Sequence, residues 1–122
     1  MKTSSEKTRS EVRRRNLASH MNQTKWSEVL PQLKPLSVQV RLKWFFDSSP
    51  GSWSGSYLLP VDGYFEETSF GPIPFREIEW LELRTNNLEA LEGTLISLNI
   101  PFSREGNHLK IWGYSSFGVD FV

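Results

Sequence analysis

The sequence predicts an α+β fold in a single domain, with a mainly antiparallel sheet, N-terminal helices and one further helix packed on the sheet. The chain has 122 residues, a usual length for one hydrophobic core. Helix-like apolar spacing and strand-like alternation occupy separate stretches, and a favoured hairpin turn divides two apolar runs near the C-terminus. We expect residues 1–20 to form a basic helix or arm and residues 21–122 to form the domain.

Two helices are predicted before the sheet. Residues 4–20 contain helix formers but almost no apolar face, which predicts a solvated, loosely attached helix. Residues 22–34 have Asn22 as a plausible N-cap. Their apolar residues recur at the spacing of one helix face: Trp26, Val29, Leu30 and Leu33. Pro31 should kink this helix or end it early.

A long strand is predicted over residues 37–47, because apolar and polar residues alternate there. One predicted face consists of Val38, Val40, Leu42, Trp44 and Phe46. The other consists of Gln39, Arg41, Lys43 and Phe45. Turn residues fill 48–55, and residues 56–60 read as a short returning strand that Pro60 ends.

The C-terminal half predicts a strand, a helix and a hairpin. Residues 76–84 have strand character. Residues 86–99 read as a helix with Asn86 as its N-cap and a stripe of leucines. Residues 100–114 predict a hairpin around the turn Gly106-Asn107, after which the short apolar tail is expected to dock at the sheet edge.

Charge is divided unevenly along the chain. Residues 1–43 carry ten Lys/Arg and three Asp/Glu, whereas residues 44–122 carry four Lys/Arg and eleven Asp/Glu. Such a division favours binding to a charged partner, or a basic helix that folds onto an acidic sheet in the same molecule. The sequence has no cysteine, no apolar run long enough to cross a membrane and no signal-peptide pattern, so a cytoplasmic protein is expected.

Residues 62–80 combine carboxylates with aromatic rings in a stretch that reads mostly as loop. Exposed rings in a loop are costly unless the fold or a partner covers them. We expect burial of most rings, with Phe65, Phe70 and Phe75 inside, and contact with a partner for a few. The predicted binding residues are Asp62, Tyr64, Glu66, Glu67, Glu77 and Glu79.

Two other functions are considered from the residues. Glu77 and Glu79, two apart on a strand, could serve a carbohydrate hydrolase with Trp53 or Tyr57 as a sugar platform, although alternating Glu on a wet strand face is the commoner cause of such a pattern. Alternatively, three basic residues of the N-terminal helix could contact nucleic acid: Arg13, Arg14 and Arg15. Against this, a stacking platform needs rings and cations on one surface, and most of the rings fall in the acidic half.

The two histidines predict no metal site. His108 flanks the hairpin turn opposite Glu105, which predicts a cross-strand ion pair or a solvated turn. His20 follows the basic helix, where a partly charged imidazole favours the helix dipole. Neither has metal-ligand spacing, and no glycine-rich phosphate loop occurs, so neither a metal nor a cofactor is predicted.

Three stretches carry a resemblance to a known family. They are LASHMNQTKW at 17–26, IEW at 78–80 and LNIPF…GNHLKIWGY at 98–114. Together they resemble a family of small bacterial proteins of unknown function, with an L-x-S-x-M-N-x-T-K-W opening and a closing N-I-P-F…G-Y hairpin. The resemblance implies no activity, although the small α+β form is similar in style to immunity proteins of bacterial toxin systems. We expect a non-enzymatic interaction protein with a basic protein partner, possible self-association and no membrane contact. The most specific form of this hypothesis is immunity-type neutralisation of a toxin.

Overall fold

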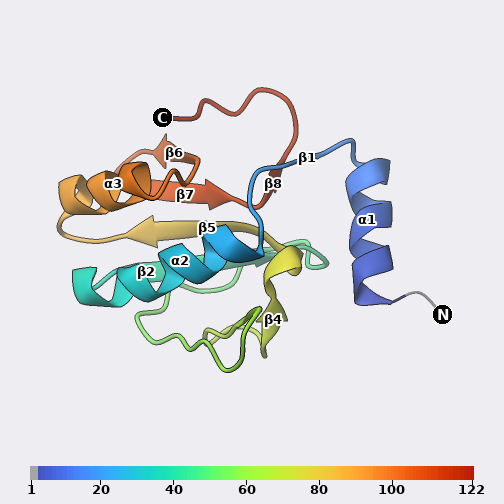
Figure 1. Cartoon of the computed structure of the whole chain (residues 1–122), viewed down its shortest axis with the longest axis horizontal. Helices are drawn as coiled ribbons and strands as arrows, with labels where there is room; N and C mark the ends of the chain where they lie inside the picture. The colour runs from blue at the N-terminus through green and yellow to red at the C-terminus, as the bar shows by residue number, and fades with distance from the viewer. Residues whose placement is uncertain (1–2) are drawn as a thin grey trace.

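The computed structural model describes residues 3–122 and centres on a four-stranded antiparallel sheet in the order β2-β5-β7-β6 (Figure 1). These strands are β2 (Gln39–Trp44), β5 (Ile78–Arg84), β6 (Phe102–Glu105) and β7 (His108–Trp112). Two short antiparallel pairs flank the sheet: β1 (Ala18–Ser19) with β8 (Tyr114–Ser115), and β3 (Tyr64–Phe65) with β4 (Ile73–Pro74). The helices are α1 (Ser4–Arg14), α2 (Gln23–Leu33) and α3 (Leu88–Ser97), and the 3-10 helices are η1 (Lys34–Leu36) and η2 (Phe75–Glu77). The predicted α+β fold is confirmed, and residues 1–2 of the expected arm lie outside the described residues.

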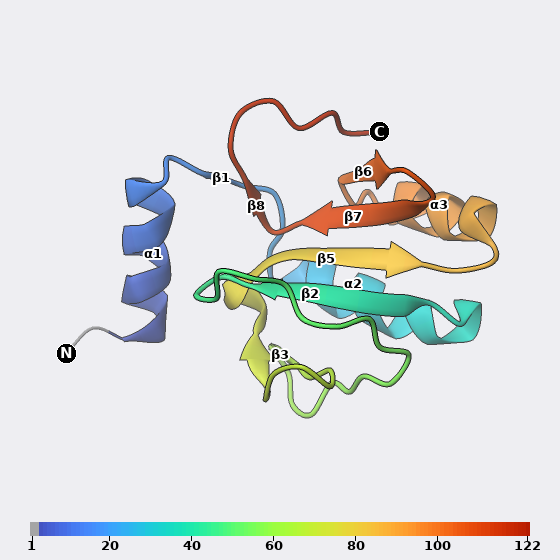
Figure 2. The same cartoon turned by 180° about the vertical axis from the view of Figure 1, so that it is seen from behind.

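Helices α2 and α3 lie on one face of the sheet, and α1 stands beside one end of it (Figure 1). Seen from behind, β2, β5 and β7 are in front and both packed helices are behind them (Figure 2). Within residues 3–122, no helix packs on this second face. One face of the sheet is therefore dry and the other meets solvent, as is usual for antiparallel sheets.

The core lies between the sheet and the two packed helices. Strand register places Leu42 opposite Leu81, and Leu81 opposite Ile111, so a row of aliphatic side chains crosses the strands. All three are fully buried. The helices contribute the residues that face this row: Val29, Leu30 and Leu33 from α2, and Leu91 and Leu95 from α3. Burial of this apolar area is the main favourable contribution to folding.

Helices α2 and α3 form close to where they are predicted. Asn22 caps α2 by accepting a hydrogen bond from Lys25 N at 2.8 Å. Pro31 does not end the helix, which reaches Leu33; Pro31 lies on the exposed side, away from the buried stripe. For α3 the predicted cap is wrong by one residue, because Asn87, not Asn86, accepts from a backbone amide of the first turn.

Two strand predictions need correction. Strand β2 ends at Trp44, after which burial is the reverse of the predicted alternation: Phe45 is buried and Phe46 is exposed. Phe45 is covered because it packs edge-on against Tyr114, with ring centroids 5.0 Å apart. Residues 56–60 form no strand, only an isolated bridge from Leu58.

Irregular segments occupy both edges of the sheet. At the β2 edge, Val40 and Ser54 exchange backbone hydrogen bonds of 2.8 Å. At the β6 edge, Val122 N donates to Phe102 O at 2.8 Å, so the tail docks as expected. The hairpin between β6 and β7 turns at Gly106, whose φ of 65° is easily adopted by glycine. Within residues 3–122, no helix is both long and apolar enough to span a membrane.

Candidate functional site

The structure divides the six predicted binding residues into two groups. Asp62 and Tyr64 are exposed and Glu66 is partly exposed. The other three are buried carboxylates: Glu67, Glu77 and Glu79. Burial of an ionised carboxylate is costly unless it is hydrogen-bonded or paired, so the partners of these three decide what they do.

Glu77 connects η2 to the N-terminal helix. Its Oε1 accepts from Trp44 Nε1 at 3.0 Å, and its Oε2 accepts from the Ser4 hydroxyl of α1. Glu77 therefore does not lie on a strand with Glu79, as the sequence suggests, but in the 3-10 turn before it. Both oxygens of its carboxylate thus accept hydrogen bonds from groups of the same chain.

Glu79 holds the end of the same helix. It is an extra residue in β5, because the register passes from Trp80 to Ile78 while β2 advances by one residue. Such a bulge redirects a side chain. The Glu79 carboxylate accepts from both Arg15 Nη atoms, at 2.9 and 3.0 Å, and lies 3.3 Å from Lys43 Nζ. The pair raises the pKa of Arg15. Arg15, one of the three arginines predicted to contact nucleic acid, is thus paired with a carboxylate of its own chain. Helix α1 is attached to the sheet more firmly than the sequence predicts.

The remaining residues of the predicted basic contact stay at the surface of α1. Arg13 and Arg14 are exposed, and Arg14 forms an ion pair with Glu11 of its own helix at 2.7 Å. That pair lowers the pKa of Glu11, chiefly through the hydrogen bond. Of the three arginines, only Arg15 therefore pairs with an acidic residue of the sheet, and at the other end of α1 it is the Ser4 hydroxyl that contacts one.

Glu67 stabilises the loop before β4. Its Oε1 accepts from Ser69 N at 2.9 Å and from Phe70 N at 3.2 Å. Its Oε2 is buried and, within residues 3–122, has no hydrogen-bond partner. The aromatic rings nearby behave largely as expected, since Phe65 and Phe75 are buried and Phe70 is partly buried against the core.

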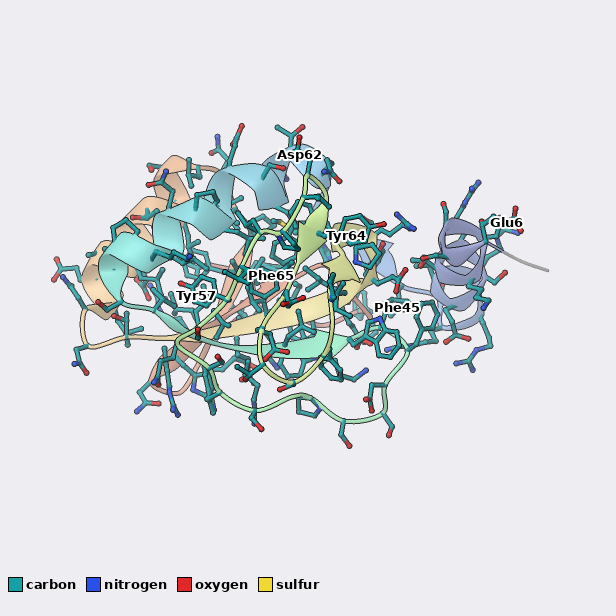
Figure 3. The ribbon with its side chains drawn as sticks, turned by 90° about the horizontal axis from the view of Figure 1, so that it is seen from below. Glu6, Phe45, Tyr57, Asp62, Tyr64 and Phe65 are labelled. Atoms are coloured by element: carbon teal, nitrogen blue, oxygen red, sulfur yellow. The ribbon has the colours of Figure 1, made fainter. Side chains whose placement is uncertain are left out.

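The exposed members of the predicted site belong to a larger surface, here called the loop patch. It consists of Leu58, Leu59, Val61, Asp62, Tyr64 and Glu66. Leu58, Leu59 and Val61 are 55%, 41% and 60% exposed. Backbone bonds hold the segment together: Leu58 and Glu66 pair at 2.7 and 2.9 Å, and Tyr64 N donates to Val61 O at 3.1 Å. Figure 3 shows Asp62 and Tyr64 on this loop.

Two buried rings anchor the loop patch from below. Phe65 and Tyr57 lie 5.7 Å apart between ring centroids, and the Tyr57 hydroxyl donates to Val38 O at 3.3 Å (Figure 3). Burial raises the pKa of Tyr57 to about 12. The apolar part of the patch was missed because residues 56–60 read as a strand, although Gly55 and Pro60, which bound the stretch, are residue types that also mark loops.

A second surface lies on the sheet face opposite the helices, and we call it the tryptophan face. It consists of Arg41 on β2, Trp80 and Arg84 on β5, His108, Lys110 and Trp112 on β7, and Trp53 from the loop after β2. Trp80 and Trp112 are directly opposite each other, and Lys110 Nζ lies 4.2 and 4.7 Å from their ring centroids. At the other end, the Arg84 guanidinium lies 4.3 Å from the Trp53 ring.

A buried carboxylate supports the tryptophan face from below. Glu82 is 3% exposed, and its two oxygens accept from Arg41 Nε and His108 Nε2, each at 2.7 Å. The expected pairing of His108 with Glu105 is therefore wrong. Glu105 is opposite His108 in register, but its carboxylate lies 3.3 Å from Lys110 Nζ instead. His108 turns inward because a carboxylate on the central strand offers it a shielded acceptor.

A groove of about 560 Å³ opens at the Trp53 end of this face. Its walls include Arg41, Trp53, Arg84 and His108. Arg84 Nε donates to Gln39 Oε1 at 2.6 Å, and within residues 3–122 no carboxylate pairs with Arg84. The groove thus combines an indole ring with a guanidinium whose charge is not neutralised by an acid.

His20 does not serve the helix dipole as expected. It follows β1, beyond the end of α1, and its Nε2 lies 2.6 Å from Ser115 Oγ. Burial, with a smaller effect of the nearby Lys25 ammonium, lowers the pKa of His20. The imidazole therefore takes up a proton less readily than a free histidine, and its ring also packs against Phe121 at 4.8 Å between centroids.

Comparison with known proteins identifies the family and nothing beyond it. No curated protein and no solved structure matches the chain. A family model matches residues 8–118, which includes both ends of the resemblance seen in the sequence. The chain belongs to DUF6678, a family of unknown function.

Proposed function

We propose that the protein is a non-enzymatic interaction protein that binds a basic partner protein through the loop patch. The most specific form of this proposal is that the protein neutralises a toxin, as immunity proteins do. One observation carries it: three aliphatic side chains that are close in the sequence, Leu58, Leu59 and Val61, are all exposed, and the acidic residues Asp62 and Glu66 follow them in the same loop.

The physical argument rests on the cost of exposed apolar surface. Neighbouring exposed aliphatic side chains, rimmed by polar groups, are typical of sites where proteins bind each other. Tyr64 adds a residue type that is enriched among interface anchors. Asp62 and Glu66 would attract a basic partner and increase the rate of encounter. Since Phe65 and Tyr57 fix the loop from below, the patch is preformed, which lowers the entropic cost of binding.

The carbohydrate hydrolase gains no support from the geometry. Glu77 and Glu79 are both engaged by internal donors, which leaves neither carboxylate free as an acid or a base. Tyr57 is buried, and Trp53 contacts Arg84 at the far end of β5. A sugar platform beside the two glutamates is therefore not assembled.

Site-specific photo-crosslinking in producing cells tests the proposal. A crosslinking residue replaces Val61 in the loop patch, and the matched control replaces Ile96, which is 58% exposed on α3. We expect one basic protein to be captured from position 61 and not from position 96. The purified pair should then bind less tightly when Asp62→Lys and Glu66→Lys are introduced. Equal capture from both positions, no capture, or binding that is indifferent to the charge reversal would refute the proposal.

A further inference from the structure

We propose that the tryptophan face binds single-stranded nucleic acid, with bases stacked on its rings and phosphates paired with its cations. This site is separate from the loop patch and does not depend on the function proposed for it. It also differs from the N-terminal helix, which is where the sequence alone would place a nucleic-acid contact.

The first argument is that the fold brings rings and cations onto one surface. Along the chain, Arg41 belongs to the basic part, whereas Trp80 and Trp112 belong to the acidic part. Because β5 lies between β2 and β7, the sheet brings these side chains to neighbouring positions on the same face. A sequence-tolerant single-strand site requires this combination of aromatic rings and basic groups.

The second argument concerns charge. Glu79 and Glu82 are buried, and each is already paired with cations of the chain, so neither carboxylate is presented to a ligand. Glu105, at the rim, is paired with Lys110. The guanidinium of Arg84 has no such acid, so an anion that enters the groove gains an ion pair without displacing one.

The third argument is the layout of the rings. Trp53 stands at the Arg84 end of β5, and Trp80 pairs with Trp112 nearer the opposite end. Arg84 is four positions along the strand from Trp80, which corresponds to about 13 Å at the usual rise of a strand. The face therefore has two aromatic sites along one line, each with a cation of the chain over a ring, so that a base can stack on the layer of ring and cation. Helices α2 and α3 lie on the other side of the sheet (Figure 2).

The same features decide between single-stranded nucleic acid and other occupants. An acidic peptide would use the cations but would leave the indole rings without flat partners. A carbohydrate would use the rings but would leave the charge of Arg84 without an anion. A single strand uses both, since its bases stack on indole and guanidinium planes and its phosphates pair with Arg and Lys.

Fluorescence anisotropy tests the proposal by measuring the affinity of the full chain for fluorescein-labelled oligothymidylate and oligouridylate over a series of salt concentrations. Each oligomer is about twelve nucleotides long. Quenching of tryptophan fluorescence should accompany binding. We expect Trp53→Ala to weaken binding at least about fivefold, because stacking on one ring is lost. Arg84→Gln should weaken binding and reduce the slope of log affinity against log salt by roughly 0.7, the value for one phosphate contact.

The controls separate this site from others. Phe117→Ala removes a fully exposed ring that is not a member of the tryptophan face, and Arg13→Gln removes a cation from α1; both should leave the affinity unchanged. Circular dichroism and thermal unfolding verify that each variant is folded. The proposal is overturned by the absence of binding at low salt, by an abasic oligomer of the same length that binds equally well, by a polyglutamate peptide that competes equally, or by Arg13→Gln having the larger effect.

Discussion

The two faces of the sheet are made by the same strands and differ completely in composition. The helix-covered face is aliphatic, and side chains such as Leu81 and Leu83 are fully buried there. The opposite face places Trp80 and Arg84 outward from the same strand, above the buried Glu82. Alternation along one strand thus defines two surfaces, of which only the covered face is required to hold the helices.

The largest effect should come from the covered face. Leu81→Ala should lower the free energy of unfolding by about 2–5 kcal/mol, because it leaves a cavity in the row that crosses the strands. Arg84→Ala, on the other face of the same strand, should change it by no more than about 0.5 kcal/mol. Urea unfolding of both variants measures the contrast. Comparable losses for the two would contradict the assignment of the faces.

The next effect concerns the carboxylate beneath the tryptophan face. Glu82→Ala should lower the free energy of unfolding by about 1–3 kcal/mol, because Arg41 and His108 lose their shared acceptor. Both partners still reach water, with side chains 33% and 26% exposed, so the loss should be smaller than for a fully buried pair. Chemical unfolding with His108→Gln and the double variant measures the coupling. Strict additivity would show that the two residues do not act together.

A smaller and more local effect is expected where α1 joins the sheet. Arg15→Gln should speed amide hydrogen exchange in residues 4–14 while the sheet amides stay protected, because one end of α1 loses its bidentate contact with Glu79. The global free energy of unfolding should change by about 1 kcal/mol or less. Arg13→Gln is the matched control on the exposed side of the helix. Unchanged exchange in Arg15→Gln would show that α1 is held by other contacts.

The smallest effect should appear as a pH dependence. The folded state lowers the pKa of His20 from its usual 6.5, so the unfolded chain takes up a proton first as the pH falls. The contribution of His20 to the free energy of unfolding is therefore fully present above about pH 6.5 and is lost as the pH falls through the pKa that His20 has in the folded state. Unfolding free energies from pH 7 to pH 5 should decline less steeply for His20→Gln. A steeper decline in that variant would reverse the sign and refute the assignment.

The elements that follow local rules were predictable from the sequence. Asn22 and the stripe after it indicate α2, and the Gly106 turn indicates the C-terminal hairpin. Errors fall where distant segments override the local pattern. Phe45 is buried because Tyr114 and α1 reach it, and residues 56–60 leave the sheet edge because Tyr57 enters the core.

The candidate surfaces were less predictable than the fold. Asp62, Tyr64 and Glu66 lie in the loop patch, but Glu77 and Glu79 are engaged by Ser4 and Arg15, which no spacing rule connects to them across the chain. The tryptophan face was missed for a related reason. Its members come from three strands and a loop, and strand order, unlike alternation, is not encoded in any short stretch of sequence.

The segments that occupy the sheet edges limit how the protein can be recognised. Backbone groups of β2 bond to Ser54, and those of β6 bond to Val122. An incoming extended peptide that seeks to lengthen the sheet would first have to displace one of these segments. The same shielding hinders edge-to-edge stacking of copies, the usual first step toward fibrous aggregates. Recognition is thereby directed to side chains and away from the bare peptide backbone.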